Sequence, residues 1–188
     1  MYVALSIPED ALWTDEQRPF VRELRTFTVR QPWPLLMAAH RAFDPSGFRD
    51  LLRACAVISL RYNVIGGLVT NEQERVYNSV AQKVAKRELT LAGDTIRALA
   101  PIYIADKTFS TAFADKVLRT TSGRNKNVAL YMLFRLEHHA SGTEFDADSR
   151  KYSLEHILPE NPGNNWPEYS DEEADESLYR LGNFALLE

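Results

Sequence analysis

Apolar residues recur at intervals of three or four between residues 48 and 65, and this spacing constrains the fold more than any other feature of the sequence. An α-helix repeats about every 3.6 residues, so the spacing places these side chains on one face. Gly66 and Gly67 are expected to end the helix. The apolar face comprises Phe48, Leu51, Leu52, Cys55, Ile58, Tyr62 and Ile65.

Weaker versions of the same pattern predict further helices, so the fold class is mainly α. Ser46 is a candidate N-cap of the helix above, and Pro34 is expected to begin a helix over residues 35–43. The other predicted helices cover residues 8–28, with an interruption at Pro19, and residues 72–88, 94–103, 108–118 and 128–136.

The C-terminal part of the sequence follows a different period. Residues 152–158 alternate in a pattern of two, which predicts a short strand that ends at Pro159. Turn-forming residues fill positions 161–165, and an acidic helical segment is expected after them. The apolar residues 184–187 follow Gly182 and Asn183. We expect them to pair with the first strand as an antiparallel hairpin.

Glu155 and His156 are neighbours within the first predicted strand. Successive residues of a strand point to opposite faces, so the two side chains would share one ligand only if the strand bends or a metal sits at its end. By spacing alone, the simpler interpretation is a surface pair on an edge strand, because short motifs match by accident.

Three motifs extend this pattern: Glu-His-Ile-Leu-Pro-Glu at 155–160, Trp166, and Leu-Gly-Asn-Phe-Ala-Leu-Leu at 181–187. Together they resemble the C-terminal nuclease domain of GmrSD-type, modification-dependent restriction endonucleases. The helical residues 27–140 also resemble the segment that precedes these motifs in that family, including Trp-Pro-Leu-Leu at 33–36. The family belongs to the His-Me finger nucleases (HNH-like, ββα-metal), whose hallmark is His-x-x-Pro.

The resemblance implies roles for particular residues. His156 matches the catalytic histidine and would take a proton from the attacking water, a task suited to a side chain whose unperturbed pKa is about 6.5. Glu155 would be a metal ligand for Mg²⁺ or another divalent cation, which prefers oxygen atoms. Asn183 would either orient the histidine or tie the hairpin together. Pro159 and Trp166 would be structural.

One departure from the family pattern concerns the end of the sequence. In the ββα-metal arrangement a helix with another metal ligand follows the hairpin, whereas this sequence stops at Glu188. We therefore expect a helical array over residues 1–140 and an incomplete His-Me finger hairpin region, packed on the helices, over residues 141–188. We expect weak metal binding and little or no cleavage from this chain by itself.

Charge is distributed unevenly along the sequence. Residues 141–188 contain 12 acidic and 3 basic side chains, whereas residues 1–140 contain 14 acidic and 19 basic ones. A basic region is typical of a nucleic-acid surface, although arginines on amphipathic helices also solvate the outer face of ordinary domains. The best candidates for DNA contacts form two clusters: Arg22, Arg25 and Arg30, then Lys83, Lys86 and Arg87.

Other chemistries find little support. Cys55 is the only cysteine and lies on an apolar face, so a disulfide within the chain and a cysteine-based zinc site are excluded and a core role is expected. His138 and His139 are adjacent and do not chelate well from one helix. The sequence contains no Gly-rich phosphate loop, signal peptide or apolar run long enough to cross a membrane, so we expect a cytoplasmic protein.

Taken with the resemblance, these observations predict the C-terminal part of a metal-dependent DNA endonuclease of the restriction and defence type. DNA, including modified DNA, would be the substrate, and full-length relatives carry an upstream ParB-like nucleotide-binding domain. The alternative is a non-catalytic DNA- or protein-interaction module derived from such a nuclease.

Overall fold

The computed structural model of the chain describes residues 1–142, 151–161, 166, 170, 172 and 176–188. These residues form two compact units, Met1–Ala114 (unit 1) and Asp115–Glu188 (unit 2). Unit 1 is helical, and unit 2 combines one long helix with a two-stranded antiparallel sheet. The mainly helical architecture with a C-terminal hairpin agrees with the prediction from sequence. No helix in the described residues is long and apolar enough to span a membrane.

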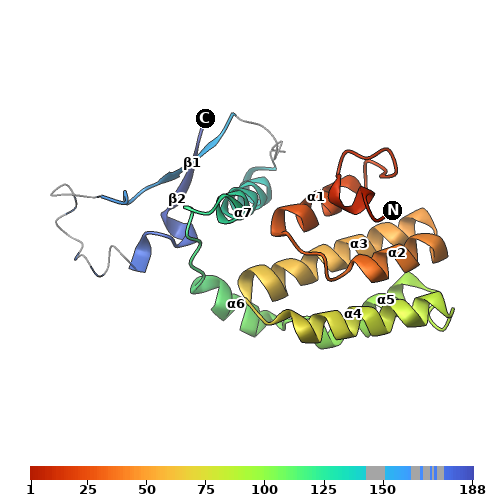
Figure 1. Cartoon of the computed structure of the whole chain (residues 1–188). Coiled ribbons are helices and arrows are strands. Elements are labelled where there is room, and N and C mark those ends of the chain that lie inside the picture. Colours follow the sequence, from red (N-terminus) through yellow and green to blue (C-terminus); the bar gives the residue numbers. More distant parts are fainter. Residues whose placement is uncertain (143–150, 162–165, 167–169, 171, 173–175) are drawn as a thin grey trace. The chain divides into compact units, whose positions relative to one another are not determined.

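Unit 1 is built around α3, which packs against α1, α2 and α5, while α2 also packs against α4 (Figure 1). The apolar face of α3 is buried from Phe48 to Ile58. Tyr62 and Ile65 of the π-helical turn that follows, η2, are buried as well. The helices are α1 (Arg18–Phe27), α2 (Trp33–Ala42), α3 (Pro45–Ser59), η2 (Leu60–Ile65), α4 (Thr70–Ala85), α5 (Ala92–Ala98) and α6 (Asp106–Ala114), with short 3₁₀ turns η1 (Ala4–Ser6) and η3 (Ala100–Ile102).

Two glycines end the central helix where the sequence predicts. A side chain at Gly66 would come within 2.6 Å of Ile104 Cδ1 and 3.0 Å of the Arg61 carbonyl oxygen. Gly67 has a positive φ of 58°, which glycine adopts without a steric penalty. The chain therefore leaves the helix at this point and turns towards α4.

The predicted first helix was wrong at its start, because residues 8–17 form turns and α1 begins at Arg18. Pro19 lies in the first turn of the helix, where its missing N–H is not needed, and so it begins the helix instead of interrupting it. The preceding segment is held by Trp13, whose indole N–H donates to the carbonyl oxygens of Ala4 (3.0 Å) and Ile7 (3.1 Å).

The predicted N-cap of α3 was also wrong. The helix begins at Pro45, so Asp44 is the cap and its carboxylate accepts a hydrogen bond from the Gly47 N–H at 3.0 Å. Ser46 donates its hydroxyl to the same carboxylate at 2.8 Å. These two hydrogen bonds, that of Ser46 first, lower the pKa of Asp44.

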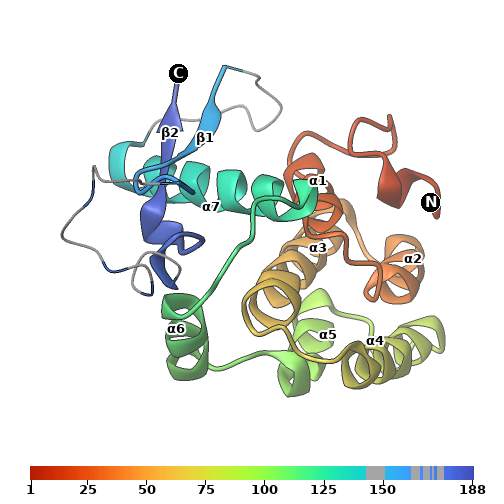
Figure 2. The ribbon, with the colours of Figure 1, turned by 60° about the vertical axis from the view of Figure 1, so that its left-hand side comes forward.

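The hairpin of unit 2 consists of β1 (Ser153–His156) and β2 (Phe184–Leu187), which pair antiparallel with His156 opposite Phe184 and Glu155 opposite Ala185. Both strands contact α7 (Gly123–Ser141), as Figure 2 shows. A 3₁₀ turn, η5 (Leu181–Asn183), leads into β2. The buried apolar residues of the unit are Leu118, Val128, Ala129, Met132, Phe134, Leu154, Leu158 and Phe184.

The segment between α6 and α7 differs from the prediction, which continued a helix to residue 118. The helix ends at Ala114, Val117 forms an antiparallel bridge with Arg180, and the Leu118 N–H donates to the Tyr179 carbonyl oxygen at 2.8 Å. Pairing with a distant segment thus replaces the helical hydrogen bonds. The predicted acidic helical segment falls largely, and the acidic residues 145–148 entirely, outside the described residues.

Candidate functional site

His156 is the last residue of β1, and its imidazole is half-buried within unit 2. Phe184 lies directly opposite it in the sheet, so both side chains occupy the same face, with ring centroids 5.0 Å apart and edge to face. Tyr179 contacts it in the same manner at 5.8 Å. The hydroxyl of Thr120 lies 3.4 Å from Nε2. These three side chains restrict the orientation of the imidazole.

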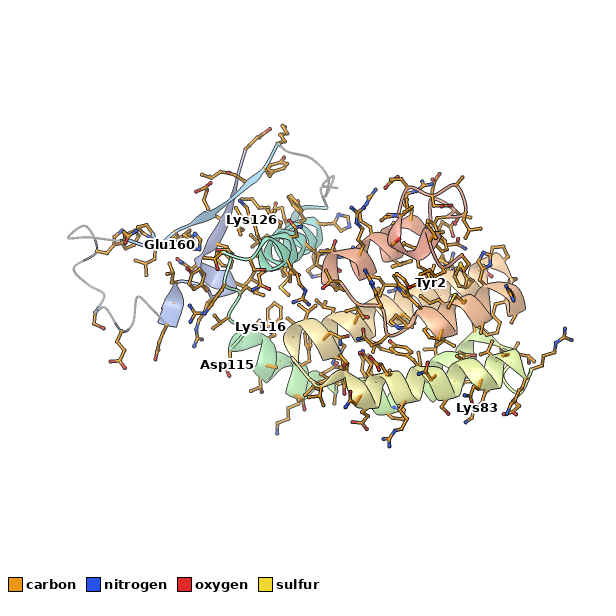
Figure 3. The ribbon with its side chains drawn as sticks, viewed as in Figure 1. Tyr2, Lys83, Asp115, Lys116, Lys126 and Glu160 are labelled. Carbon is orange, nitrogen blue, oxygen red and sulfur yellow. The ribbon has the colours of Figure 1, made fainter. Side chains whose placement is uncertain are left out.

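Tyr179 connects the histidine to charged groups. Its hydroxyl donates to a carboxylate oxygen of Glu160, which is labelled in Figure 3, at 2.9 Å. The Arg119 guanidinium lies 5.5 Å from the centroid of its ring. Lys116 lies close to Arg119 in the sequence. Its pKa is lowered, chiefly by burial and also by the positive charge of Arg124. Unit 2 therefore carries its own basic side chains beside an otherwise acidic sequence.

Sequence reasoning missed Thr120, Tyr179 and Arg119. Thr120 and Tyr179 reach the histidine, and Arg119 reaches Tyr179, through the pairing of residues 117–118 with residues 179–180, which are about 60 positions apart. No local period or motif signals such a contact.

Glu155 does not lie with His156. It is exposed, and the regular pairing of β1 with β2 directs its carboxylate to the opposite face of the hairpin. The strand keeps this pairing through His156, so the bend that would bring the two side chains to one ligand is not found.

A metal site requires several His, Cys, Asp or Glu side chains to converge. In the parts of the chain that the structure describes, no three His, Cys, Asp or Glu side chains come together in a way that could hold an ion. Glu155 supplies a suitable oxygen ligand, but one carboxylate does not form a site.

Asn183 is buried and its side chain makes three hydrogen bonds to backbone groups. Its Oδ1 accepts from the Leu158 N–H at 2.7 Å, and its Nδ2 donates to the carbonyl oxygens of Leu158 (3.0 Å) and Leu178 (2.9 Å). The Ile157 N–H adds a bond to the Asn183 carbonyl oxygen at 2.9 Å. The sequence left two roles open for Asn183, and these contacts fit the one in which it links the two sides of the hairpin.

The two predicted basic clusters belong to unit 1. Arg22 pairs with Glu9, and Arg25 and Arg30 line a pocket at the junction of α1 and α2. The second cluster is exposed at the C-terminal end of α4, where Lys83 is labelled in Figure 3. Arg87 adopts a positive φ of 61° as the chain leaves this helix, and Lys86 precedes it.

Several residues with reactive side chains have structural positions. Cys55 is fully buried, and this burial raises the pKa of its thiol to about 12, as expected for a core cysteine. Arg61 donates to the Ile104 carbonyl oxygen at 2.8 Å and pairs with Asp106 at 2.6 Å. His138 and His139 lie in the last turn of α7. None of these residues adds to the group around His156.

Comparison with known proteins supports the importance of this region. The family model described as "GmrSD restriction endonucleases, C-terminal domain" matches residues 103–188. The match covers α6 and all of unit 2, including His156 and its neighbours Thr120, Tyr179 and Phe184. No curated protein and no solved structure gave a match to the chain.

Proposed function

We propose that the protein forms the nuclease part of a DNA endonuclease, because its residues 103–188 match the family model of GmrSD restriction endonuclease C-terminal domains. The reaction is hydrolysis of phosphodiester bonds, in the setting of defence against foreign and modified DNA. The cytoplasm is the compartment in which such a protein would meet that DNA.

The observation that carries this proposal is the environment of His156. Within the family match, its imidazole is bounded by Phe184, Tyr179 and Thr120, so it is held in place while remaining half-buried and not enclosed. A general base needs such restricted geometry together with access to water.

The ring nitrogens of His156 would divide the work. Nε2 lies beside the Thr120 hydroxyl, whereas Nδ1 has no hydrogen-bond partner among the described residues. When Nε2 carries the hydrogen and donates it to Thr120, Nδ1 is free to accept a proton from water that attacks the phosphorus. Thr120 is thus a positioning residue, and the Tyr179 and Phe184 rings limit rotation of the imidazole.

Nucleases of this kind depend in general on a divalent metal ion, which supplies positive charge at the scissile phosphate and leaving oxygen when it is bound. Glu155 is the proposed ligand for Mg²⁺ or a similar ion, because it directly precedes the His-x-x-Pro motif, where related nucleases have an acidic metal ligand. The remaining ligands are not assigned. Asn183 supports the site through the backbone around Leu158.

The partners follow from the same proposal. DNA is the substrate that the family implies, and an upstream ParB-like nucleotide-binding domain is proposed for the full-length protein. The basic residues Arg22, Arg25, Arg30, Lys83, Lys86 and Arg87 are proposed contacts to DNA phosphates. Such contacts would weaken steeply as the salt concentration rises.

The second candidate is a binding module that retains the nuclease hairpin without cleaving DNA. The opposite orientations of Glu155 and His156 favour it, because they separate the two side chains from which catalysis would be built. In this case DNA or a protein partner would be bound but left intact.

A plasmid-nicking assay separates the two candidates. The product of the complete gene is incubated with supercoiled plasmid, both modified and unmodified, in the presence of Mg²⁺, Mn²⁺ or a chelator. The nuclease proposal predicts metal-dependent conversion to nicked or linear DNA. Retarded but uncut plasmid, under conditions where the protein is folded, would replace it with the binding-module candidate.

A further inference from the structure

Unit 1 contains a pocket of about 380 Å³ where α1 ends and α2 begins. This volume is within the range of small-molecule sites, roughly 300–1,000 Å³, and is larger than a bare inorganic anion requires. All of its lining residues belong to unit 1, and no motif in the sequence signals it. The lining residues are Leu5, Ser6, Leu24, Arg25, Thr28, Val29, Arg30 and Trp33.

The backbone around the pocket is already satisfied by its own turn. Thr28 takes a left-handed conformation with φ 57°, and its N–H donates to the Arg25 carbonyl oxygen at 2.9 Å. The Val29 N–H donates to the Leu24 carbonyl oxygen at 3.1 Å. These bonds cap the C-terminal carbonyls of α1. The polar groups left to a ligand are therefore chiefly side chains.

Those side chains are strongly positive. Among the residues that the structure describes, Arg25 and Arg30 line the pocket and no carboxylate does. Within the part of the chain that the structure describes, neither arginine forms an ion pair. Arg22, one turn before Arg25, is by contrast paired with Glu9. Two full charges outweigh the partial negative charge of about 0.5 at the end of a helix.

Arg30 is also held in a defined orientation. Its guanidinium lies 5.3 Å from the centroid of the Trp33 ring, and the ring of Tyr2 contacts Trp33 edge to face with centroids 5.0 Å apart. A guanidinium stacked by its face keeps the N–H groups at its edge available. These groups form paired hydrogen bonds with phosphate oxygens.

The rest of the wall combines apolar side chains with the hydroxyl groups of Ser6 and Thr28. Leu5 and Leu24 are almost fully buried, Val29 is 5% exposed, and Trp33 is 8% exposed. A ligand that fills the pocket therefore needs an anionic group at one end and a less polar body at the other.

We propose that this pocket binds one nucleotide unit, with its phosphate between Arg25 and Arg30 and its sugar and base along Leu5, Leu24 and Val29. The unit can come from a DNA strand or from a free nucleotide, because both present the same group. The inference rests on the proposed function only if the bound unit belongs to a DNA strand. It does not involve the residues of the hairpin.

Calorimetric titration with deoxycytidine 5′-monophosphate, deoxycytidine and inorganic phosphate tests the proposal. We expect the monophosphate to bind and deoxycytidine, which has no phosphate, to bind at least tenfold more weakly, since hydrogen bonds to charged groups provide the larger share. Inorganic phosphate should bind less tightly than the monophosphate because it leaves the apolar wall uncovered.

Variants identify the site. Arg25→Gln and Arg30→Gln should each weaken binding of the monophosphate about tenfold, and Arg30→Lys should restore only part of it because lysine keeps the charge but not the planar fork. The matched control is Arg53→Gln, an exposed arginine of α3 outside the pocket, which should bind as the unaltered protein does. Equal binding by all three glutamine variants would overturn the proposal, as would no detectable binding of any probe.

A DNA arm distinguishes the source of the nucleotide. A short single strand is titrated into the His156→Ala protein, so that cleavage does not interfere. Tighter binding of the strand than of the monophosphate, lost in Arg25→Gln and Arg30→Gln, assigns the pocket to DNA, whereas monophosphate binding that the strand does not compete for assigns it to a free nucleotide. Binding of the monophosphate and of the single strand can both be measured on a protein that does not nick DNA. This proposal and the proposed function can therefore fail independently.

Discussion

At the residue scale, Glu155 is the position where the family motif and the geometry disagree most. The motif suggests a metal ligand, and the pairing of β1 with β2 turns the carboxylate away from His156. If Glu155 holds the ion, Glu155→Gln should raise the metal concentration for half-maximal nicking by about tenfold or more, because an amide oxygen carries no charge. Glu137→Gln on the exposed side of α7 is the control. An unchanged metal titration would remove Glu155 from the site.

Cys55 and Tyr77 are fully buried titratable groups of unit 1, and burial raises the pKa of both. The pKa of Cys55 rises from 9.0 to about 12, and that of Tyr77 rises well above 10.0, again chiefly by burial. Below pH 9 both groups are neutral in the folded and unfolded chains. As the pH rises above 9 the unfolded chain loses protons first, so folding becomes less favourable.

We therefore expect the free energy of unfolding to fall by roughly 1 kcal/mol per pH unit above pH 9 from the Cys55 contribution. Urea unfolding of the protein and of Cys55→Ala between pH 8 and pH 11 measures this. The variant should show a shallower fall with pH, whatever its absolute stability. Parallel curves for the two proteins would show that the thiol does not titrate as the structure implies.

At the element scale, the buried side chain of Asn183 links the two sides of the hairpin by hydrogen bonds to the backbone. Asn183→Ala would leave the Leu158 N–H and two carbonyl oxygens without these partners in a buried region. Unsatisfied buried groups cost about 1–3 kcal/mol each, so we expect a loss of roughly 2–4 kcal/mol in the stability of unit 2. Chemical unfolding followed by circular dichroism measures it.

The matched control is Asn127→Ala, an exposed asparagine on α7 of the same unit. Its effect should be within about 0.5 kcal/mol. If Asn183→Ala behaved like this control, the tie would not be what holds the residues after β1 to the turn before β2.

The elements themselves show what a sequence of this kind reveals. α3 and both strands were predictable, because their periods of 3.6 and 2 lie within short stretches and burial enforces them. The start of α1 and the cap of α3 were missed, because prolines at the first helical positions shifted both starts. His156 was proposed from a motif. Thr120 and Tyr179 were not, because their contact with it depends on pairing between distant segments.

At the scale of the whole molecule, the two compact units have separate cores and different charge. Unit 1 carries the predicted basic clusters and the arginine-lined pocket, and unit 2 carries His156. The family match begins within unit 1, at Tyr103, and so includes α6 with the hairpin unit. The proposed DNA contacts and the proposed catalytic residue therefore lie in different parts of the chain and can be tested separately.

The central claim is that His156 is the base in DNA cleavage. The most direct measurement is the nicking rate of supercoiled plasmid by the complete gene product, by its His156→Ala variant and by His139→Ala, an exposed histidine in the last turn of α7. General base catalysis is worth about 10²–10⁴ in rate, so His156→Ala should lose at least about 100-fold while His139→Ala and the circular dichroism spectra stay unchanged. Nicking by folded His156→Ala within a few fold of the unaltered protein would contradict the claim.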